Sequence, residues 1–237
     1  MANKRILADI GELNKPIYAD SGIYYKEDES NIRKGYACIF GPEGTPYEDC
    51  PMLYSFSIDD GFPFDPPKVL FHTHDGVTRF HPNMYVEGKV CLSILHTWEG
   101  PKWASTMRLS TVLITIQSLM DNAPILHEPG YSNQSKDSEN VKAYSIFIEH
   151  SCIQYILERA ERPLQPDALV PFNEIFKDRL PKILERLEKR LSKLLQTGEC
   201  SFTNLPYQLH GTTNYKKCLE RTLTLRANIK LKVQTTL

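Results

Sequence analysis

The chain has 237 residues, a formal net charge of −1, 41% hydrophobic residues and 24% charged residues. This composition is close to the globular average, so disorder of the whole chain is excluded as the default, and the length predicts one or two domains. The sequence contains no run of 18 apolar residues, so it predicts no membrane-spanning helix. Residues 1–6 lack the apolar core of a signal peptide. We therefore expect no membrane association and a cytoplasmic or nuclear location.

Charge is distributed unevenly along the chain. Residues 1–165 carry 22 acidic and 15 basic side chains, whereas residues 166–237 carry 7 acidic and 13 basic ones. A basic tail of this kind can contact an acidic partner, nucleic acid or a membrane surface. The interpretation we favour is that these charges lie on solvated helix faces, and we expect no nucleic-acid partner.

The six cysteines are far apart in the sequence and include no Cys-x-x-Cys pair. They are Cys38, Cys50, Cys91, Cys152, Cys200 and Cys218. In the expected compartment they should stay reduced, and most are predicted to be small buried hydrophobic residues. Any cysteine chemistry must therefore come from one of them in a special setting.

The first part of the chain predicts a helix followed by strands. Ile6, Ile10 and Leu13 are spaced to share one face of a helix over residues 2–14, which Pro16 is predicted to end. Runs rich in β-branched and aromatic residues then predict strands, at residues 22–25, 35–40, 52–58 and 69–72. Gly- and Pro-rich turn residues separate the second strand from the third, so these two should pair as antiparallel neighbours.

Residues 76–108 show little periodicity, and an irregular stretch of this length in a compact domain is usually functional. A wide apolar stripe then predicts a central core helix at residues 109–120, and one or two more helices are predicted within residues 140–162. The order of a helix, antiparallel strands and then helices predicts an α+β fold.

Pro163 and Pro166 mark a predicted boundary between a core domain, residues 1–165, and a helical C-terminal extension, residues 166–237. An apolar stripe with helical spacing follows, formed by Leu180, Ile183, Leu184, Leu187, Leu191, Leu194 and Leu195. We expect this stripe to pack against the core domain, although a protein-docking or dimer face is the alternative. A last helix is predicted at about residues 215–233, and we expect a monomer.

The segment with the parts for chemistry runs from His81-Pro82-Asn83 to Cys91. A cysteine nucleophile, and an amide nearby that can donate a hydrogen bond to an oxyanion, are what acyl transfer requires. The His-Pro-Asn triplet alone is a weak signal, and an isolated cysteine is more often a buried core residue. Their surroundings make the pattern specific.

Several motifs flank this segment in a fixed order. They are Gly41-Pro42, Thr45-Pro46-Tyr47-Glu48, Phe62-Pro63-x-x-Pro66-Pro67-Lys68-Val69, Gly88-Lys89-Val90-Cys91-Leu92-Ser93-Ile94-Leu95, Trp103 and Glu128-Pro129. With them, residues 1–160 resemble the ubiquitin-conjugating enzyme family. The stretch from Val90 to Trp103 resembles the large, extended branch that includes the Apollon-type proteins and the enzyme charged by the alternative ubiquitin-activating enzyme. The resemblance implies an N-terminal helix, a four-stranded antiparallel sheet, a central helix and C-terminal helices.

The resemblance also implies a mechanism. Cys91 is the nucleophile that carries ubiquitin, or a ubiquitin-like modifier, as a thioester received from an activating enzyme. Asn83 is the oxyanion-side amide or the brace of the loop that supports it, and His81 and Pro82 shape the turn. Glu128 matches the gate that orients the incoming substrate lysine. No cofactor is implied, because ATP is used by the upstream activating enzyme.

Partner surfaces follow from the same resemblance. Lys4 and Arg5 match the surface for the activating enzyme, and Phe64 and Ala104 lie in the two loops that contact ubiquitin ligases. Protein substrates are the remaining expected partners. Trp103 is expected to pack rather than to contact a ligase.

The sequence departs from the family pattern in places. Glu128 stands where Asp is common, and Ser93 where many members have Asp. Residues 98–102 lengthen the loop before Trp103, and Ala104-Ser105-Thr106 replaces the usual Ser-Pro-Ala. These changes leave the choice of ligase open.

Three other interpretations were weighed. A non-enzymatic member of the same fold would lack the cysteine, which this chain keeps. A cysteine hydrolase would need a base beside Cys91, and no sequence feature places His81 there. A metal site is not expected, because Cys91 has no partner cysteine and the candidate ligands fit no compact ligand set in their spacing, namely His72, His74, His81, His96 and Cys91.

Overall fold

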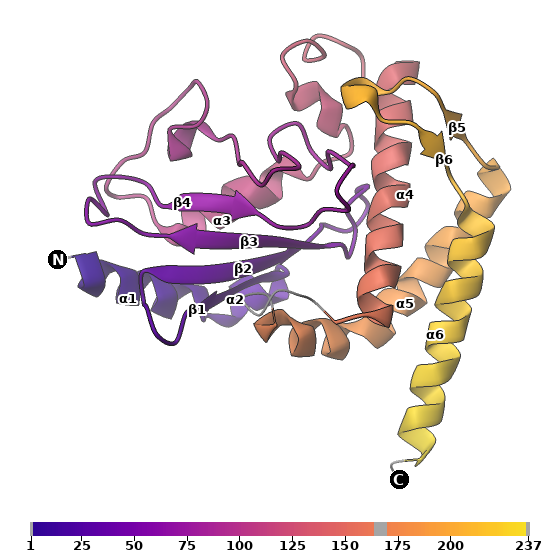
Figure 1. The fold of residues 1–237 in the computed structure, drawn as a ribbon, viewed down its shortest axis with the longest axis horizontal. Helices are drawn as coiled ribbons and strands as arrows, with labels where there is room; N and C mark the ends of the chain where they lie inside the picture. Colours follow the sequence, from indigo (N-terminus) through magenta and orange to yellow (C-terminus); the bar gives the residue numbers. More distant parts are fainter. Residues whose placement is uncertain (1, 164–169, 236–237) are drawn as a thin grey trace.

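A computed structural model describes residues 2–163 and 170–235 (Figure 1), although the side chains beyond Leu231 are left undescribed. The helices are α1 (Ala2–Leu13), α2 (Pro16–Asp20), α3 (Leu109–Leu119), α4 (Glu139–Glu161), α5 (Pro171–Thr197) and α6 (Tyr215–Thr235). The strands are β1 (Ile23–Glu27), β2 (Lys34–Phe40), β3 (Pro51–Ser57), β4 (Lys68–Phe71), β5 (Ser201–Phe202) and β6 (Gly211–Thr212). Short 3₁₀ turns lie at η1 (Ser93–Leu95), η2 (Pro124–His127) and η4 (Pro206–Gln208).

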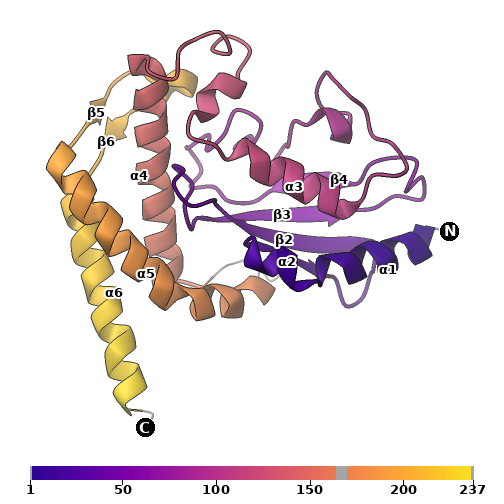
Figure 2. The ribbon, with the colours of Figure 1, turned by 180° about the vertical axis from the view of Figure 1, so that it is seen from behind.

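Strands β1 to β4 form one antiparallel sheet in sequence order, as predicted. Along β3, Tyr54 and Phe56 are buried, whereas Ser55 between them is half-buried and Ser57 is exposed. This period of two gives the sheet one apolar face. Helices α1 and α3 cover that face (Figure 2), and the predicted stripe of Ile6, Ile10 and Leu13 is buried there. The predicted α+β fold is confirmed.

The prediction that Pro16 ends the first helix was wrong. Helix α1 already ends at Leu13, and Pro16 begins the separate helix α2. Proline suits the first position of a helix, because its missing N–H has no partner there and its fixed φ is already helical. Of the one or two helices predicted within residues 140–162, the structure has one, α4. The β5–β6 hairpin was not predicted, because strands of two residues show no periodicity.

The C-terminal helices pack against the end of the sheet domain. Helix α4 crosses the end of the sheet, and α5 and α6 lie side by side on its outer face (Figures 1 and 2). Most of the predicted stripe is buried, namely Leu180, Ile183, Leu184, Leu187 and Leu191. Phe176, earlier in α5, stacks on Phe40 of β2 with ring centroids 6.4 Å apart. The stripe therefore belongs to the same hydrophobic cluster as the sheet.

The predicted domain boundary after residue 165 stays a prediction, because it falls outside the described residues.

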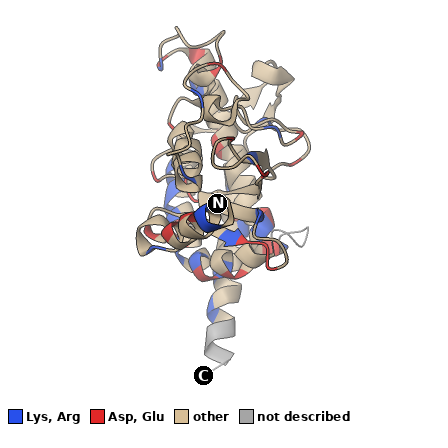
Figure 3. Ribbon diagram, turned by 90° about the vertical axis from the view of Figure 1, so that its left-hand side faces the viewer, with Lys and Arg blue, Asp and Glu red and all other residues tan. Residues whose placement is uncertain are grey.

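The uneven charge of the two parts of the sequence corresponds in part to ion pairs between the extension and the core. The extension's Arg186 binds Asp49 with Nε and Oδ2 2.8 Å apart, and Arg190 binds Glu149 with Nε and Oε1 2.8 Å apart. Basic residues of the extension thus neutralise acidic residues of the core. Acidic and basic residues are interspersed over the side of the molecule in Figure 3. Within the described residues, no helix is long and apolar enough to cross a membrane.

Two leucines of the α5 stripe that differ in burial provide a test of this packing. Leu184 is 0% exposed and Leu195 is 37% exposed. We expect Leu184→Ala to lower the free energy of unfolding by about 2–5 kcal/mol, because it leaves a cavity in a close-packed core. Leu195→Ala, the matched control, should change it by less than about 0.5 kcal/mol. Urea denaturation measures both, and a loss of less than about 0.5 kcal/mol in Leu184→Ala would mean that the stripe is not core.

Candidate functional site

His81 organises the turn that precedes the candidate nucleophile. Its Nδ1 accepts a hydrogen bond from the Asn83 N–H at 3.0 Å. Its Nε2 lies 3.0 Å from the Leu119 carbonyl oxygen at the end of α3 and donates to it. Burial lowers the pKa of His81 to about 3, and the nearby His127 ring adds to this effect. The ring is therefore neutral at physiological pH, with both nitrogens engaged, as expected of a turn brace.

Asn83 and Cys91 are joined by two hydrogen bonds. The Cys91 N–H donates to the Asn83 carbonyl oxygen at 2.8 Å. The Asn83 side-chain Nδ2 donates to the Cys91 carbonyl oxygen at 2.7 Å. Among the described residues, the buried Asn83 Oδ1 has no hydrogen-bond partner. This geometry corresponds to the loop-brace alternative for Asn83, because its amide binds a backbone carbonyl.

The chain after Cys91 is also tightly held. Thr97 Oγ1 donates to the Val90 carbonyl oxygen at 2.7 Å and accepts from the Leu92 N–H at 2.9 Å. Cys91 itself is 2% exposed, whereas the loop at residues 96–102 that follows η1 is exposed. Cys91 is therefore almost fully covered in this structure, next to an exposed loop.

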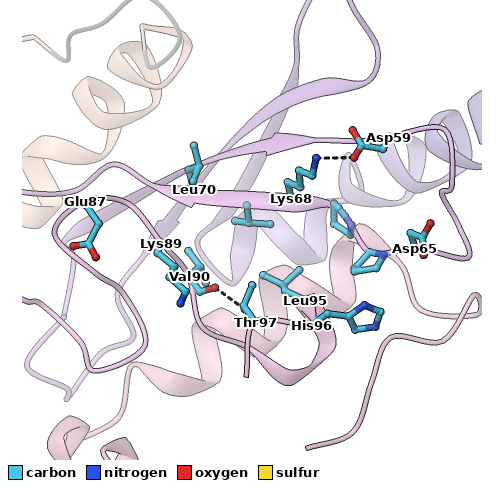
Figure 4. A pocket seen from close by; sticks show the side chains of 13 residues that line it. Asp59, Asp65, Lys68, Leu70, Glu87, Lys89, Val90, Leu95, His96 and Thr97 are labelled. Carbon is cyan, nitrogen blue, oxygen red and sulfur yellow. Dashed lines mark hydrogen bonds and ion pairs between the residues drawn. The ribbon is translucent and has the colours of Figure 1, made fainter. Parts of the chain in front are cut away.

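A surface pocket of about 550 Å³ lies between β4 and the segment leading through Cys91 (Figure 4). Leu70, Val90 and Leu95 supply apolar surface, and the ion pair of Lys68 with Asp59 borders it. The residues that line this pocket include neither Cys91 nor Asn83. The pocket therefore lies next to the candidate site, since Val90 lines it, but the candidate catalytic residues do not form it.

Glu128, the predicted gate, follows η2 and is half-buried. Its Oε2 accepts a hydrogen bond at 2.6 Å from the hydroxyl of Tyr207, which lies in the β5–β6 loop of the extension. Glu128 is thus held by a specific partner, in contrast to an ordinary solvated loop acid. The sequence predicted neither Tyr207 nor the hairpin that carries it.

Arg79 connects the same loop to the His81 turn. Its guanidinium carbon lies 3.5 Å from the Tyr85 ring centroid and 4.4 Å from the Tyr207 ring centroid. It also donates a hydrogen bond to the Pro82 carbonyl oxygen. Sequence reasoning missed Arg79, Tyr85 and Tyr207, since nothing in the local pattern relates residues so far apart in the chain.

The two predicted ligase-contact residues lie on loops that are tied together. The Trp103 Nε1 donates to the Pro63 carbonyl oxygen at 2.7 Å, which joins the loops carrying Phe64 and Ala104. Phe64 is 73% exposed and Ala104 is also exposed, whereas Trp103 is buried. Their roles stay predictions, and the exposure of Phe64 and Ala104 leaves both free to meet a partner.

The two residues predicted to meet the activating enzyme have different surroundings. Lys4 is exposed. Arg5 is half-buried, binds Asp9 with Nε and Oδ1 2.9 Å apart, and donates to the carbonyl oxygens of Ser105 and Met107. Arg5 therefore ties α1 to the segment before α3, so its removal would disturb the fold as well as a docking surface.

The histidines suggest no metal centre. His72 Nε2 lies 2.8 Å from the Ser55 hydroxyl, and both ring nitrogens of His81 have partners. Over the described part of the chain, no three His, Cys, Asp or Glu side chains form a group that could hold a metal ion.

The known proteins that this chain resembles are ubiquitin-conjugating enzymes. The family profile described as "Ubiquitin-conjugating enzyme" matches residues 7–148. The chain is 42% identical over 168 residues to ubiquitin-conjugating enzyme E2 Z of Xenopus tropicalis, and 40% identical over 151 residues to that of Homo sapiens. These alignments cover 70% and 63% of this chain, and 53% and 42% of the relatives. The chain thus spans about half the length of the curated relatives it matches.

A solved structure shares the fold. It is the ubiquitin conjugating enzyme Pex4p of H. polymorpha, in complex with the soluble domain of Pex22p. The TM-score is 0.52 at 26% sequence identity, over 65% of this chain and 97% of that one.

The depressed pKa of His81 predicts a pH dependence of stability. The pKa falls from 6.5 to about 3 on folding, so between these values the unfolded chain binds a proton that the folded chain does not. The contribution of His81 to stability is therefore full above pH 6.5 and is lost as the pH falls toward 3, by up to about 1.4 kcal/mol per pH unit. We expect His81→Gln, which keeps a donor and an acceptor but does not titrate, to flatten this part of the curve.

Denaturant unfolding at intervals between pH 4 and pH 7 measures the slope. The exposed His210 gives the matched control, His210→Gln, which should leave the slope unchanged. Identical slopes for the wild type and His81→Gln would contradict the assignment of a buried neutral imidazole.

Proposed function

Because the chain belongs to the ubiquitin-conjugating enzyme family, on its E2 Z-like branch, we propose that Cys91 carries a modifier as a thioester and passes it to a substrate lysine. The modifier is ubiquitin or a ubiquitin-like protein. The observation that supports this most is the doubly hydrogen-bonded closure of Asn83 on Cys91 inside the region that matches the family.

Loading is an exchange between two thioesters. The Cys91 thiolate attacks the modifier's C-terminal carbonyl carbon, a new S–C bond forms, and the cysteine of the activating enzyme leaves as a thiolate. Bonds of the same kind are made and broken, so the exchange is nearly balanced in free energy. We expect it to need no metal, nucleotide or other cofactor in this protein, because ATP is consumed by the activating enzyme.

Discharge is the more demanding step. A neutral lysine amine attacks the same carbonyl carbon, an oxyanion develops, and the Cys91 thiolate leaves as an amide forms. The closure between Asn83 and Cys91 holds the loop in the geometry in which the oxyanion can be stabilised. A preorganised polar site of this kind stabilises the transition state without reorganising during the reaction.

Glu128 is proposed to orient the incoming lysine and to favour loss of its proton. A carboxylate does not lower the pKa of a nearby ammonium group by its charge, because opposite charges stabilise each other. Desolvation of the lysine is the effect that lowers its pKa. Glu128 is half-buried, which is consistent with a site that supplies both an acceptor and a partly dry environment.

The proposed protein partners meet the chain at exposed positions. Lys4 on α1 is proposed to contact the activating enzyme, with Arg5 holding that helix in place. Phe64 and Ala104 are proposed to contact a ligase. Protein substrates are the remaining proposed partners. The proposed place of action is the cytoplasm or the nucleus.

A cysteine hydrolase is less well supported. It would need a base that takes the proton of the thiol. His81 is neutral, but its Nδ1 already accepts from Asn83 and its Nε2 faces the Leu119 carbonyl oxygen. It therefore has no free nitrogen with which to act on Cys91.

A charging assay tests the proposal directly. We expect a thiol-sensitive adduct, one modifier heavier, when the protein is mixed with ubiquitin, ATP and one of the two kinds of ubiquitin-activating enzyme. Cys91→Ala should abolish it, because the attacking sulfur is gone. The control Cys200→Ala changes a half-buried cysteine in the extension and should leave the adduct intact. An adduct that persists in Cys91→Ala, or its absence from wild type with every modifier tried, would refute the proposal.

Removing the Asn83 amide should separate the two steps. We expect Asn83→Ala to slow single-turnover discharge onto lysine more than loading, because the Asn83 amide braces the loop beside the developing oxyanion. The loss of a direct oxyanion donor, about a hundred- to a thousandfold in rate, sets the upper limit of the effect. Asn31→Ala, in the exposed turn before β2, provides a control for the loss of an amide. Parallel losses in loading and discharge would mean that Asn83 only stabilises the fold.

A further inference from the structure

We propose that Tyr207, supplied by the C-terminal extension, is a positioning residue for the Glu128 gate, so that the extension takes part in lysine transfer. This inference rests on the function proposed above. Its starting point is the hydrogen bond of 2.6 Å from the Tyr207 hydroxyl to Glu128 Oε2. The two residues are 79 positions apart in the sequence, so the contact exists only when the extension is docked.

The tyrosine keeps its donor proton in this setting. Burial and the hydrogen bond to Glu128 both raise the pKa of Tyr207 well above its usual value. A hydroxyl that remains protonated can donate continuously to a carboxylate, and such charge-assisted hydrogen bonds fix direction as well as distance. The Tyr207 hydroxyl thereby fixes the orientation of the Glu128 carboxylate through Oε2. The other carboxylate oxygen, Oε1, is the one that we expect to accept a hydrogen bond from the substrate amine.

The ring of Tyr207 is positioned independently of its hydroxyl. It lies 4.4 Å from the Arg79 guanidinium carbon and meets the Tyr144 ring edge-on, with centroids 6.1 Å apart. Arg79 in turn donates to the Pro82 carbonyl oxygen in the turn before Cys91. The same tyrosine thus contacts the gate through its hydroxyl, while its ring contacts Arg79, which is bonded to the turn before Cys91. A side chain that only covered the surface would need neither contact.

The backbone around Tyr207 is strained. Tyr207 and Gln208 have φ values of 62° and 61°, in the left-handed region that bulky residues avoid. Strain of this kind persists only where the surrounding structure determines it, and it is concentrated at functional sites. Here the loop is closed by the hydrogen bond from the Leu205 N–H to the Leu209 carbonyl oxygen at 3.0 Å, and both leucines are buried.

The hairpin that carries this loop is fixed to α4. The rings of Phe202 and Phe147 meet edge-on with centroids 5.9 Å apart, and the Asn214 N–H donates to His150 Nε2 at 3.0 Å. The loop lies beside the segment that follows η2 in both views of the fold (Figures 1 and 2). The gate therefore lies between the core's own 3₁₀ turn and a loop of the extension.

The decisive variant is Tyr207→Phe, which removes only the hydroxyl and keeps the ring over Arg79. We expect loading of Cys91 to be retained, and single-turnover discharge onto free lysine to fall about tenfold, the order that a hydrogen bond to a charged group supplies. Discharge onto hydroxylamine, which is already neutral at pH 7, should fall much less. The matched control is Gln208→Asn, which changes the neighbouring exposed side chain and suits the left-handed backbone.

A double-mutant cycle excludes a merely structural role. If Tyr207 acts through Glu128, Tyr207→Phe should cause no further loss in a Glu128→Ala background. Unchanged lysine discharge in Tyr207→Phe, equal slowing with both nucleophiles, or an undiminished effect in Glu128→Ala would each overturn the inference. Failure of the wild type to form any thioester would instead refute the proposed function, so the two failures are distinguishable.

Discussion

The buried, neutral imidazole of His81 is the constraint on which the candidate site depends. A charged ring in this position would be strongly disfavoured by desolvation, so the side chain accepts at one nitrogen and donates at the other. These two bonds connect the end of α3 to the backbone of Asn83. Asn83 in turn holds both backbone groups of Cys91. Cys91, the proposed nucleophile, is thus placed by a chain of hydrogen bonds that begins at the end of the core helix.

The extension is joined to the core by packing and by complementary charge. Arg186 and Arg190 on α5 bind Asp49 and Glu149 of the core, so part of the opposite net charge of the two halves is neutralised within the molecule. Asp49 is almost fully buried, and a buried carboxylate without its partner would be costly. The arginine opposite it therefore fixes where α5 docks, while the apolar stripe supplies most of the stability. The position of Tyr207 over Glu128 follows from that docking.

The sequence predicted well those features that have a local signature. Alternation in β3 and the apolar stripes of α1 and α3 are periodic, so these elements were found to within a few residues. The stripe of α5 was also recognised, but the helix begins at Pro171, well before the first stripe residue, Leu180. The His-Pro-Asn and cysteine segment was selected as the candidate site because the motifs around it, in their order, resemble the ubiquitin-conjugating enzyme family. Tyr207 and Arg79 could not be found in this way, because their contacts join distant segments and neither has a motif. Arg5 shows a different limit of the sequence. The family resemblance predicted a docking residue, but it could not show that Arg5 also ties α1 to the chain before α3.

The structure separates the residues proposed for chemistry from those proposed for recognition. Asn83, Cys91 and Glu128 are buried or half-buried and hydrogen-bonded, whereas Lys4 and Phe64 are exposed. Preorganisation suits chemistry, because a fixed dipole need not reorient as charge develops. Exposure suits recognition, because a partner must displace only water. Cys91 is held by Asn83 through its backbone and is only 2% exposed, so the proposed thioester exchange requires the side chains that cover this residue to give way.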